Sequence, residues 1–185
     1  GYDFRPSYLK IAEIREFLPG IPVLALTATA TPEVVNDIQD QLHFGQKNVF
    51  RKSFSRSNLA YVVRVSENKD EQLLKILAAV PGTSVVYVRN RKKTKEVAEF
   101  LLKNGILAEY FHAGLSNEVK DQRQGRWKSG ATRVIVSTNA FGMGIDKAEV
   151  RSVIHLDLPD TLEAYFQEAG RAGRDPPAIS PRGRR

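Results

Sequence analysis

Residues 85–111 read VVYVRNRKKTKEVAEFLLKNGILAEYF. The stretch begins with β-branched and aromatic residues at Val85–Val88, which predict a buried strand. Apolar side chains then recur at helical spacing over Thr94–Lys103, and Asn104-Gly105 is a typical helix end. Another short run at Ala108–Phe111 predicts a second strand. Strand, helix and strand in this order are typical of a parallel βαβ unit.

The same alternation of strands and helices is predicted on both sides of this unit. Upstream, Val23–Leu26 has the composition of a buried strand, and Thr31-Pro32-Glu33 has the capping threonine, proline and acid of a helix start. Further strands are predicted at Arg133–Ser137 and Ser152–Leu156, and further helices at Asp70–Val80, Asn117–Lys128 and Leu162–Ala169. We therefore predict an α/β fold with a parallel sheet flanked by helices. Ligands of such sheets bind at the carboxyl ends of the strands, so the residues that follow each strand are the candidates for function.

The composition predicts a globular protein and excludes several kinds of site. Hydrophobic residues make up 42% of the 185 residues, which is enough to form a core. The absence of cysteine excludes disulfides and thiol catalysis, and the three histidines do not have metal-ligand spacing, so we expect no metal site formed by this chain alone. The sequence has neither a membrane-spanning apolar run nor a signal-peptide pattern. We expect a soluble intracellular protein with no membrane partner, and, because there is no initiator methionine, further residues upstream of Gly1.

The charge is distributed unevenly along the chain. The net charge is +7, but residues 1–50 carry 4 Lys and Arg against 6 Asp and Glu, whereas residues 51–175 carry 21 against 15. A basic middle segment is typical of proteins that bind a polyanion. A solvated surface with a modest cationic excess explains the charge equally well, so composition leaves both interpretations open.

Two common phosphate-binding motifs do not occur in the sequence. A Walker loop, G-x-x-x-x-G-K-[ST], is excluded because Ala131 follows Gly125 and Gly130 where the lysine would have to be. The run Gly142–Lys147 lacks the third glycine of a dinucleotide fingerprint. Asp70-Glu71 is similar to the acidic pair of a motor ATPase, but it precedes a predicted helix and is best explained as helix N-terminal charge.

Three stretches carry a family resemblance. They are LTATA at residues 26–30, STNAFGMGID at residues 137–146 and QEAGRAGRD at residues 167–175. They resemble motifs III, V and VI of superfamily two helicases, and the last two are similar in wording to those of the RecQ DNA helicases. Segments 1–6, 53–59 and 110–115 also resemble parts of that family, with Phe111 as an extra residue.

The resemblance implies two RecA-like domains of the P-loop NTPase helicase fold, with ATP and Mg²⁺ bound in the cleft between them. It assigns residues 1–52 to the end of the first domain and the joint between the two domains, and residues 53–175 to the second domain. Residues 176–185, rich in proline and arginine, are predicted to be a disordered or cloning-derived tail. The Walker lysine and the acidic pair belong to the N-terminal helicase domain, which the resemblance places upstream of Gly1. The zinc-binding and winged-helix regions common in the family are not found in this sequence.

The resemblance also assigns roles to individual residues. Arg174 is the candidate arginine finger, and Arg171 is its partner on the phosphates, since a guanidinium group can neutralise charge on a transferring phosphoryl group. Their spacing of three places both on one face if they lie on a helical turn. Nucleotide binding is assigned to Gln167, Gly144 and Asp146, coupling of hydrolysis to DNA movement to Thr27 and Thr29, and the DNA track to Asn90, Arg91, His112, Thr138 and Asn139.

The implied function is ATP-driven 3′–5′ movement along single-stranded DNA with unwinding of partially duplex DNA, in repair or recombination. The protein would act at the nucleoid in a bacterial cytoplasm or in a eukaryotic nucleus, and the chain alone is expected to be inactive. Two alternatives stay open, an RNA helicase of the DEAD-box type and a non-catalytic nucleic-acid-binding module. Capping or turn formation explains Thr27 and Thr29 equally well, and Trp127 is predicted to pack in the core instead of stacking on a base.

Overall fold

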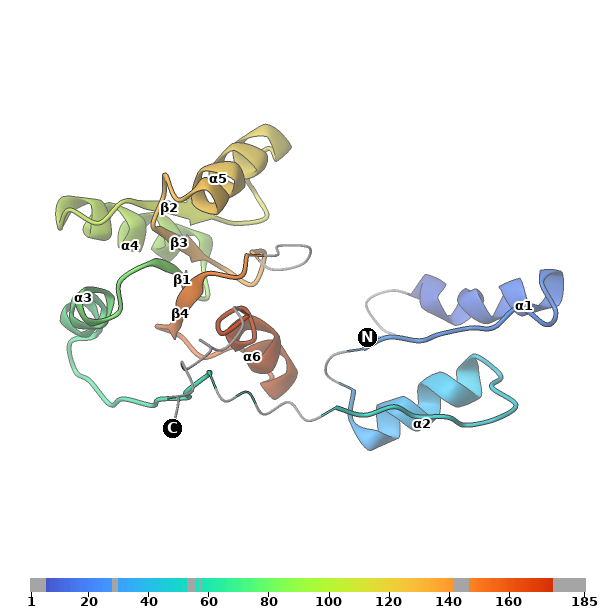
Figure 1. Ribbon diagram of the computed structural model, residues 1–185. Helices are drawn as coiled ribbons and strands as arrows, with labels where there is room; N and C mark the ends of the chain where they lie inside the picture. Colours follow the sequence, from blue (N-terminus) through green and yellow to red (C-terminus); the bar gives the residue numbers. More distant parts are fainter. Residues whose placement is uncertain (1–5, 28–29, 53–55, 57, 142–146, 175–185) are drawn as a thin grey trace, which may run out of the picture. The chain divides into compact units, whose positions relative to one another are not determined.

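The computed structural model describes residues 6–27, 30–52, 56, 58–141 and 147–174. By its internal contacts the chain divides into two compact units, Gly1–Phe54 and Ser55–Arg185. Each unit has its own helices, and the strands of the described residues all belong to the second unit (Figure 1).

The first unit consists of helices and connecting segments. A 3₁₀ helix, η2, spans Pro6–Glu13, a single α-helical turn, α1, spans Ile14–Phe17, and α2 spans Pro32–Gln41. The predicted start of α2 is confirmed, because the Thr31 hydroxyl accepts a hydrogen bond from the Val34 amide. Sequence reasoning did not predict η2 and α1. The α1 turn has only 4 residues and no side-chain capping hydrogen bond, so it carries no start signal.

The predicted strand at Val23–Leu26 is wrong. These residues form neither helix nor strand, and the side chains of Leu24 and Leu26 are 76% and 84% exposed. An apolar run becomes a buried strand only where a neighbouring strand takes up its backbone hydrogen bonds. The described residues of the first unit contain no strand that could pair with it. The composition of the run is therefore not sufficient to form a strand.

The second unit is built on a parallel sheet. Its strands are β1 (Thr83–Tyr87), β2 (Ala108–Phe111), β3 (Val134–Ser137) and β4 (Val150–His155). They lie in the order β2-β3-β1-β4. The helices are α3 (Lys69–Ala79), α4 (Arg91–Lys103), α5 (Asn117–Ser129) and α6 (Leu162–Ala169). The predicted α/β fold with a parallel sheet and flanking helices is confirmed (Figure 1).

Helices pack on both faces of this sheet because the connections reverse direction. The chain passes from β1 over β3 to β2 and then returns to β3, and right-handed connections in opposite directions place α4 and α5 on opposite faces. Val86 lies in one core with Leu77 of α3 and Leu101 of α4. Its neighbour Val85 points to the other face and lies in a second core with Trp127 of α5. Trp127 is only 1% exposed, which confirms its predicted place in the core.

Several element boundaries differ from the predicted ones by two or three residues. Helix α4 begins at Arg91, three residues early, because the side-chain oxygen of Asn90 accepts a hydrogen bond from the Lys93 amide and caps the helix. Strand β4 begins at Val150, two residues early, where a shift in register interrupts its pairing with β1. The predicted end of α4 is confirmed, and Gly105 just beyond it has a φ of 75° that favours glycine.

Candidate functional site

All four strands of the sheet end in register at one edge. Phe111 of β2 lies opposite Ser137 of β3, which lies opposite Tyr87 of β1. Tyr87 in turn lies opposite His155 of β4. The segments that leave this carboxyl edge carry the residues predicted to line a DNA track, namely Asn90, Arg91, His112, Thr138 and Asn139. The fold therefore brings together, at the usual ligand-binding edge, residues that are far apart in the sequence.

Arg91 and His112 approach each other although they follow different strands. A Cβ atom placed on Gly114 would lie 2.8 Å from Nη1 of Arg91 and 3.4 Å from Nδ1 of His112. Glycine at this position therefore leaves room for the guanidinium group beside the imidazole. Both side chains line a hollow in the surface, together with Lys92, Lys95, Glu96, Glu99 and Tyr110. The two lysines of this hollow pair with its two glutamates, so Arg91 and His112 are the side chains in it that suit a phosphate oxygen.

The surroundings of His112 favour its neutral form. Burial lowers the pKa of its imidazole, and the charges of Arg91 and Arg123 lower the pKa further. The ring stacks on Tyr110 at a centroid distance of 5.7 Å, and among the described residues its Nδ1 atom has no hydrogen-bond partner. A neutral imidazole can form a hydrogen bond to a backbone oxygen of a nucleic acid but adds no charge. The positive charge at this edge therefore comes from arginine and lysine.

Tyr110 and Arg123 belong to this site, although sequence reasoning did not select them. The Arg123 guanidinium carbon lies 3.8 Å from the centroid of the Tyr110 ring, and its Nη1 donates to the Tyr110 carbonyl at 2.6 Å. One sequence signal could have found Tyr110, since alternation along β2 puts it on the same side as His112. Arg123 had no such signal, because only the packing of α5 against β2 brings it there.

Thr138 and Asn139 follow β3 at the same edge, but only Asn139 is exposed. Thr138 is 9% exposed, and its hydroxyl accepts a hydrogen bond from the Ala140 amide at 3.5 Å. The Thr138 side chain thus stabilises the turn after β3. The exposed amide at this position belongs to Asn139.

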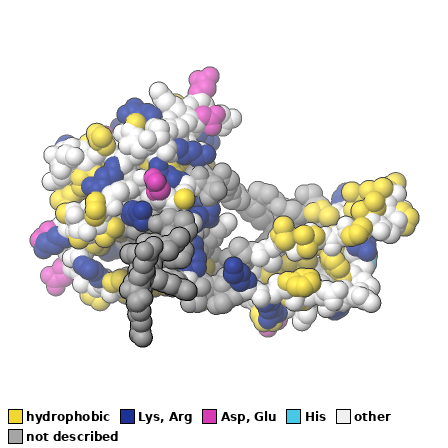
Figure 2. Space-filling view, in the orientation of Figure 1, with side chains coloured by type: hydrophobic (Ala, Val, Ile, Leu, Met, Phe, Trp, Pro, Cys, Tyr) yellow, Lys and Arg dark blue, Asp and Glu magenta, His cyan; other side chains and the backbone are white. Residues whose placement is uncertain are grey.

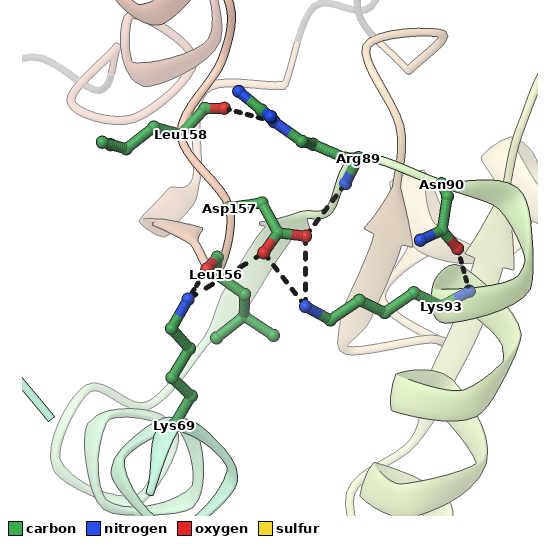
Figure 3. Close-up of polar contacts among 7 residues, drawn as sticks. All are labelled: Lys69, Arg89, Asn90, Lys93, Leu156, Asp157 and Leu158. Atoms are coloured by element: carbon green, nitrogen blue, oxygen red, sulfur yellow. Dashed lines mark hydrogen bonds and ion pairs between the residues drawn. The ribbon is translucent and has the colours of Figure 1, made fainter. Parts of the chain in front are cut away.

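A cluster of charged residues after β4 was not predicted. Asp157 accepts hydrogen bonds from Nζ of Lys93 at 3.0 and 3.1 Å and from the Arg89 amide at 3.1 Å (Figure 3). Lys69 of α3 donates to the Leu156 carbonyl at 2.6 Å and lies 3.9 Å from the same carboxylate. Partial burial by itself raises the pKa of Asp157, but these hydrogen bonds and the lysine charges outweigh it, so the pKa is lowered. The carboxylate therefore fixes α3 and α4 to the end of β4.

Replacing Asp157 with asparagine is expected to lower the free energy of unfolding by about 2 kcal/mol near neutral pH, because Lys93 loses a charged acceptor. A carboxyl group whose pKa is lowered by folding stabilises the fold above its unfolded pKa of 3.8, and this contribution is lost as pH falls through the folded pKa. The difference between the wild type and Asp157→Asn should therefore shrink in acid.

Urea unfolding followed by circular dichroism, from about pH 7 to about pH 3, measures this difference. Asp160→Asn is the control with little expected effect, since the Asp160 side chain is 91% exposed in its pair with Arg89. A difference for Asp157→Asn that stayed constant in acid would contradict the role of its charge.

The two arginines of the last motif have different environments. Residues 170–173 form turns and bends, so the side-by-side arrangement expected for Arg171 and Arg174 on a helical turn is not found. Arg171 is 6% exposed, and its Nε donates to the Tyr87 hydroxyl at 2.9 Å. Arg174 is exposed, and its Nε donates to the Gly170 carbonyl at 3.2 Å. The reason is that α6 ends before the first arginine, so helical spacing no longer applies.

Two residues of segment 53–59, which resembles part of the helicase family, hold this turn. Arg56 donates from Nη2 to the Gly170 carbonyl at 3.1 Å and from Nη1 to the Gly173 carbonyl at 3.3 Å. Asn58 donates to the same Gly173 carbonyl at 3.0 Å. Gly173 has a φ of 63°, which glycine adopts without strain. These contacts join residues 114 to 117 positions apart, so no local pattern could have shown them.

The other predicted residues are placed singly or lie outside the described chain. Gln167 is exposed on α6, and Thr27 is exposed in a segment without helix or strand. Thr29, Gly144 and Asp146 lie outside the described residues. The described part of the chain has no group of three or more His, Cys, Asp or Glu side chains that could hold a metal ion. Within the same ranges, no helix is both long and apolar enough to cross a membrane.

Basic side chains are numerous on the surface. Figure 2 shows Lys and Arg more often than Asp and Glu on the face drawn. On α4, Lys92 pairs with Glu96 and Lys95 pairs with Glu99, one helical turn apart. Part of the positive charge therefore belongs to an ordinary solvated helix surface, and part, at Arg91, to the candidate site.

Comparison with known proteins identifies the family. Residues 68–176, more than half of the chain, match the helicase conserved C-terminal domain. The chain is 43% identical over 180 residues to the RecQ-like DNA helicase blm-1 of Caenorhabditis elegans, and 44% identical over 177 residues to the ATP-dependent DNA helicase RecQ of Bacillus subtilis. Each alignment covers 95% of this chain but only 18% and 30% of the relative, so the chain spans less than a third of these relatives.

A solved structure has the same fold. The structure of S. cerevisiae Dbp5 bound to RNA and ADP BeF3 matches 89% of this chain and 45% of the Dbp5 chain, with a TM-score of 0.71. The sequence identity is 21%, so this likeness concerns the fold alone. The parallel sheet and the family match together define a RecA-like C-terminal domain of a helicase. The chain belongs to the helicase conserved C-terminal domain family, and the resemblance to RecQ DNA helicases that its motifs predicted is confirmed.

Proposed function

We propose that the chain is the second motor domain, with the end of the first, of an ATP-dependent DNA helicase that moves in the 3′–5′ direction along single-stranded DNA. The observation that carries the proposal is the common register of the strand ends, which gathers Arg91, His112 and Asn139 at one edge. Arg171 is held against Tyr87 at the same edge. The two relatives described above, blm-1 and the Bacillus subtilis RecQ, are named DNA helicases, which supports DNA as the track. Partially duplex DNA would be unwound at the nucleoid of a bacterium or in a eukaryotic nucleus.

Contact with DNA would be made through the sugar-phosphate backbone. Arg91 supplies a permanent charge for a phosphate, and neutral His112 and the Asn139 amide supply hydrogen bonds, none of which reads a base. The Tyr110 ring is already in contact with Arg123 and His112, so we assign it to positioning these two side chains and not to base stacking. The track should therefore accept any sequence.

Hydrolysis of ATP would use arginines of this domain and the Walker loop of the first domain, which holds the phosphates. Negative charge on the transferring phosphoryl group is stabilised by a guanidinium group at that place, and bound Mg²⁺ neutralises charge on the phosphate oxygens. We assign the exposed Arg174 as the arginine finger and the buried Arg171, which Tyr87 holds, as its partner on the phosphates. Further contacts with the nucleotide are proposed for Gln167, Gly144 and Asp146.

The first unit supports the assignment of residues 1–52 to the end of the first motor domain. Phe17, Leu24 and Leu26 are 79%, 76% and 84% exposed. Large apolar side chains gathered in one unit are usually covered in the complete protein. We propose that the remainder of the first motor domain covers them, and that Thr27 and Thr29 couple hydrolysis to DNA movement.

The 185-residue chain by itself is expected to hydrolyse no ATP, with or without single-stranded DNA and Mg²⁺, because it has no Walker loop to hold the phosphates. A phosphate-release assay measures this, with the complete motor as the positive control. If the chain alone hydrolysed ATP and Arg174→Ala abolished this hydrolysis, the assignment of the phosphate-binding loop to another domain would be contradicted.

The same chain is expected to bind single-stranded DNA weakly, with the logarithm of the affinity falling linearly with the logarithm of the salt concentration. Arg91→Ala should weaken binding to every sequence and lower the slope by about 0.7, the value for one phosphate contact on a single strand. Fluorescence anisotropy with two unrelated DNA sequences and one RNA measures both quantities.

Lys103→Ala is the matched control for this experiment, since Lys103 is an exposed cation at the other end of α4. Tight binding that ignored salt, or a strong preference for one sequence, would show that the edge does more than neutralise phosphates. Tighter binding to RNA than to DNA would favour an RNA track.

A further inference from the structure

A buried tyrosine joins the last motif to the segment that follows β3. Tyr87, the last residue of β1, is 2% exposed. Its hydroxyl accepts a hydrogen bond from Nε of Arg171 at 2.9 Å and donates one to the Phe141 carbonyl at 2.7 Å. The single proton and a lone pair of the phenol are thus both used. One oxygen atom links the arginine after α6 to the residue directly before segment 142–146.

The Tyr87 ring is itself held in place. It stacks on the His155 ring of β4 at a centroid distance of 5.3 Å and an interplanar angle of 16°. Nε2 of His155 lies 2.9 Å from Oε2 of Glu168 on α6, and these two side chains are 7% and 10% exposed. Arg171 lies two residues beyond the end of α6, so the contact between Glu168 and His155 helps to fix both Arg171, which donates to the phenol oxygen, and Tyr87, which accepts.

The phenol keeps its proton at any ordinary pH. Burial raises the pKa of Tyr87 to about 12, and the charge of Arg171 opposes this rise while the charge of Glu168 adds to it. A deprotonated oxygen would have no hydrogen to donate to the Phe141 carbonyl. The raised pKa therefore preserves the hydrogen bond to the Phe141 carbonyl, and with it the link from Arg171 to Phe141.

We propose that Tyr87 is a positioning residue of the motor, whose hydroxyl sets the orientation of the Arg171 guanidinium group and ties it to the Phe141 backbone. The inference rests on the proposed function, in which Arg171 acts on the ATP phosphates and the segment with Gly144 and Asp146 contacts the nucleotide. Tyr87 acts through Arg171 and touches no substrate. Because Nε is engaged, the plane of the guanidinium fork is fixed before ATP binds.

Tyr87→Phe in the complete motor tests the proposal, because it removes the hydroxyl and keeps the ring. It is expected to lower kcat for DNA-stimulated ATP hydrolysis roughly 10- to 100-fold, the effect of losing one hydrogen bond to a charged group. The KM for ATP should change by less than about threefold. Added to Arg171→Ala, the same replacement should have little further effect, because the hydroxyl acts through that side chain. Tyr61→Phe, which removes a hydroxyl from a half-exposed tyrosine, is the control and should leave kcat unchanged.

A second measurement separates this role from general stability. NMR on the 185-residue chain should show that the Nε proton of Arg171 exchanges slowly with solvent. In Tyr87→Phe the same proton should exchange rapidly, while the chemical shifts of the α3 and α4 amides stay unchanged. Fast exchange of this proton in the wild type would overturn the proposal without any variant. The proposal would also be overturned if Tyr87→Phe lowered kcat by the same factor in the wild type and in Arg171→Ala. A merely structural role of Tyr87 predicts that the effects of the two replacements add.

The outcomes also distinguish this inference from the proposed function. A complete wild-type motor that hydrolyses ATP in response to DNA, with Tyr87→Phe equally active, would overturn only the role of Tyr87. A complete wild-type motor without such hydrolysis would overturn both.

Discussion

Replacing Arg174 with alanine in the complete motor is expected to lower kcat for ATP hydrolysis by on the order of 10³-fold, while the affinity for ATP stays nearly unchanged. An arginine finger meets charge that appears chiefly in the transition state, so its removal affects the chemical step more than ground-state binding. Arg174 is exposed, and we therefore expect the variant to fold normally. Steady-state kinetics and a direct nucleotide-binding assay measure the two quantities.

Two further variants make this experiment specific. Arg174→Lys should restore little of the rate, because an ammonium group keeps the charge but loses the planar fork. Arg64→Ala removes another exposed arginine of the same unit and should leave kcat unchanged. DNA binding without nucleotide should be almost the same in all three. A variant of Arg174 that hydrolysed ATP normally but released DNA would move this residue from catalysis to DNA binding.

Replacing Trp127 with alanine is expected to lower the free energy of unfolding by about 4 kcal/mol, which is a large part of the stability of a small domain. The side chain meets Phe141 edge to face at 5.2 Å and donates from Nε1 to the Ser84 carbonyl at 3.2 Å. Alanine would leave both a cavity and a carbonyl without its donor. Trp127→Phe should cost about half as much, since it keeps most of the packing and loses the hydrogen bond.

Urea unfolding followed by circular dichroism measures these losses, because Trp127 is the single tryptophan and fluorescence cannot follow its replacement. Leu107→Ala shortens a side chain that is 59% exposed in the same unit, and it should cost less than about 1 kcal/mol. If Trp127→Ala cost no more than this control, the second core would not depend on its largest side chain.

The sequence by itself determined the local elements and the family. Helix α2 starts after the predicted cap Thr31, α4 ends at Lys103 before the predicted stop at Asn104, and α6 has the predicted bounds. These features depend on hydrogen bonds and turns within a few residues, which a local pattern contains in full. The same is true of the motifs at residues 137–146 and 167–175, because residue identity alone carries the resemblance that the comparisons confirmed.

Only the tertiary structure decided which of these elements meet. The order β2-β3-β1-β4 places the strand ends in one register, and it brings Arg123 onto Tyr110 and Arg171 onto Tyr87. The end of α6 before its arginines decided that one of them is buried and the other exposed. The run at Val23–Leu26 did not form a strand, and Leu24 and Leu26 are exposed, because the described residues of its unit contain no strand that could pair with it. Hydrophobic burial has no direction of its own, so periodicity shows which face of an element is buried but not which distant residues bury it.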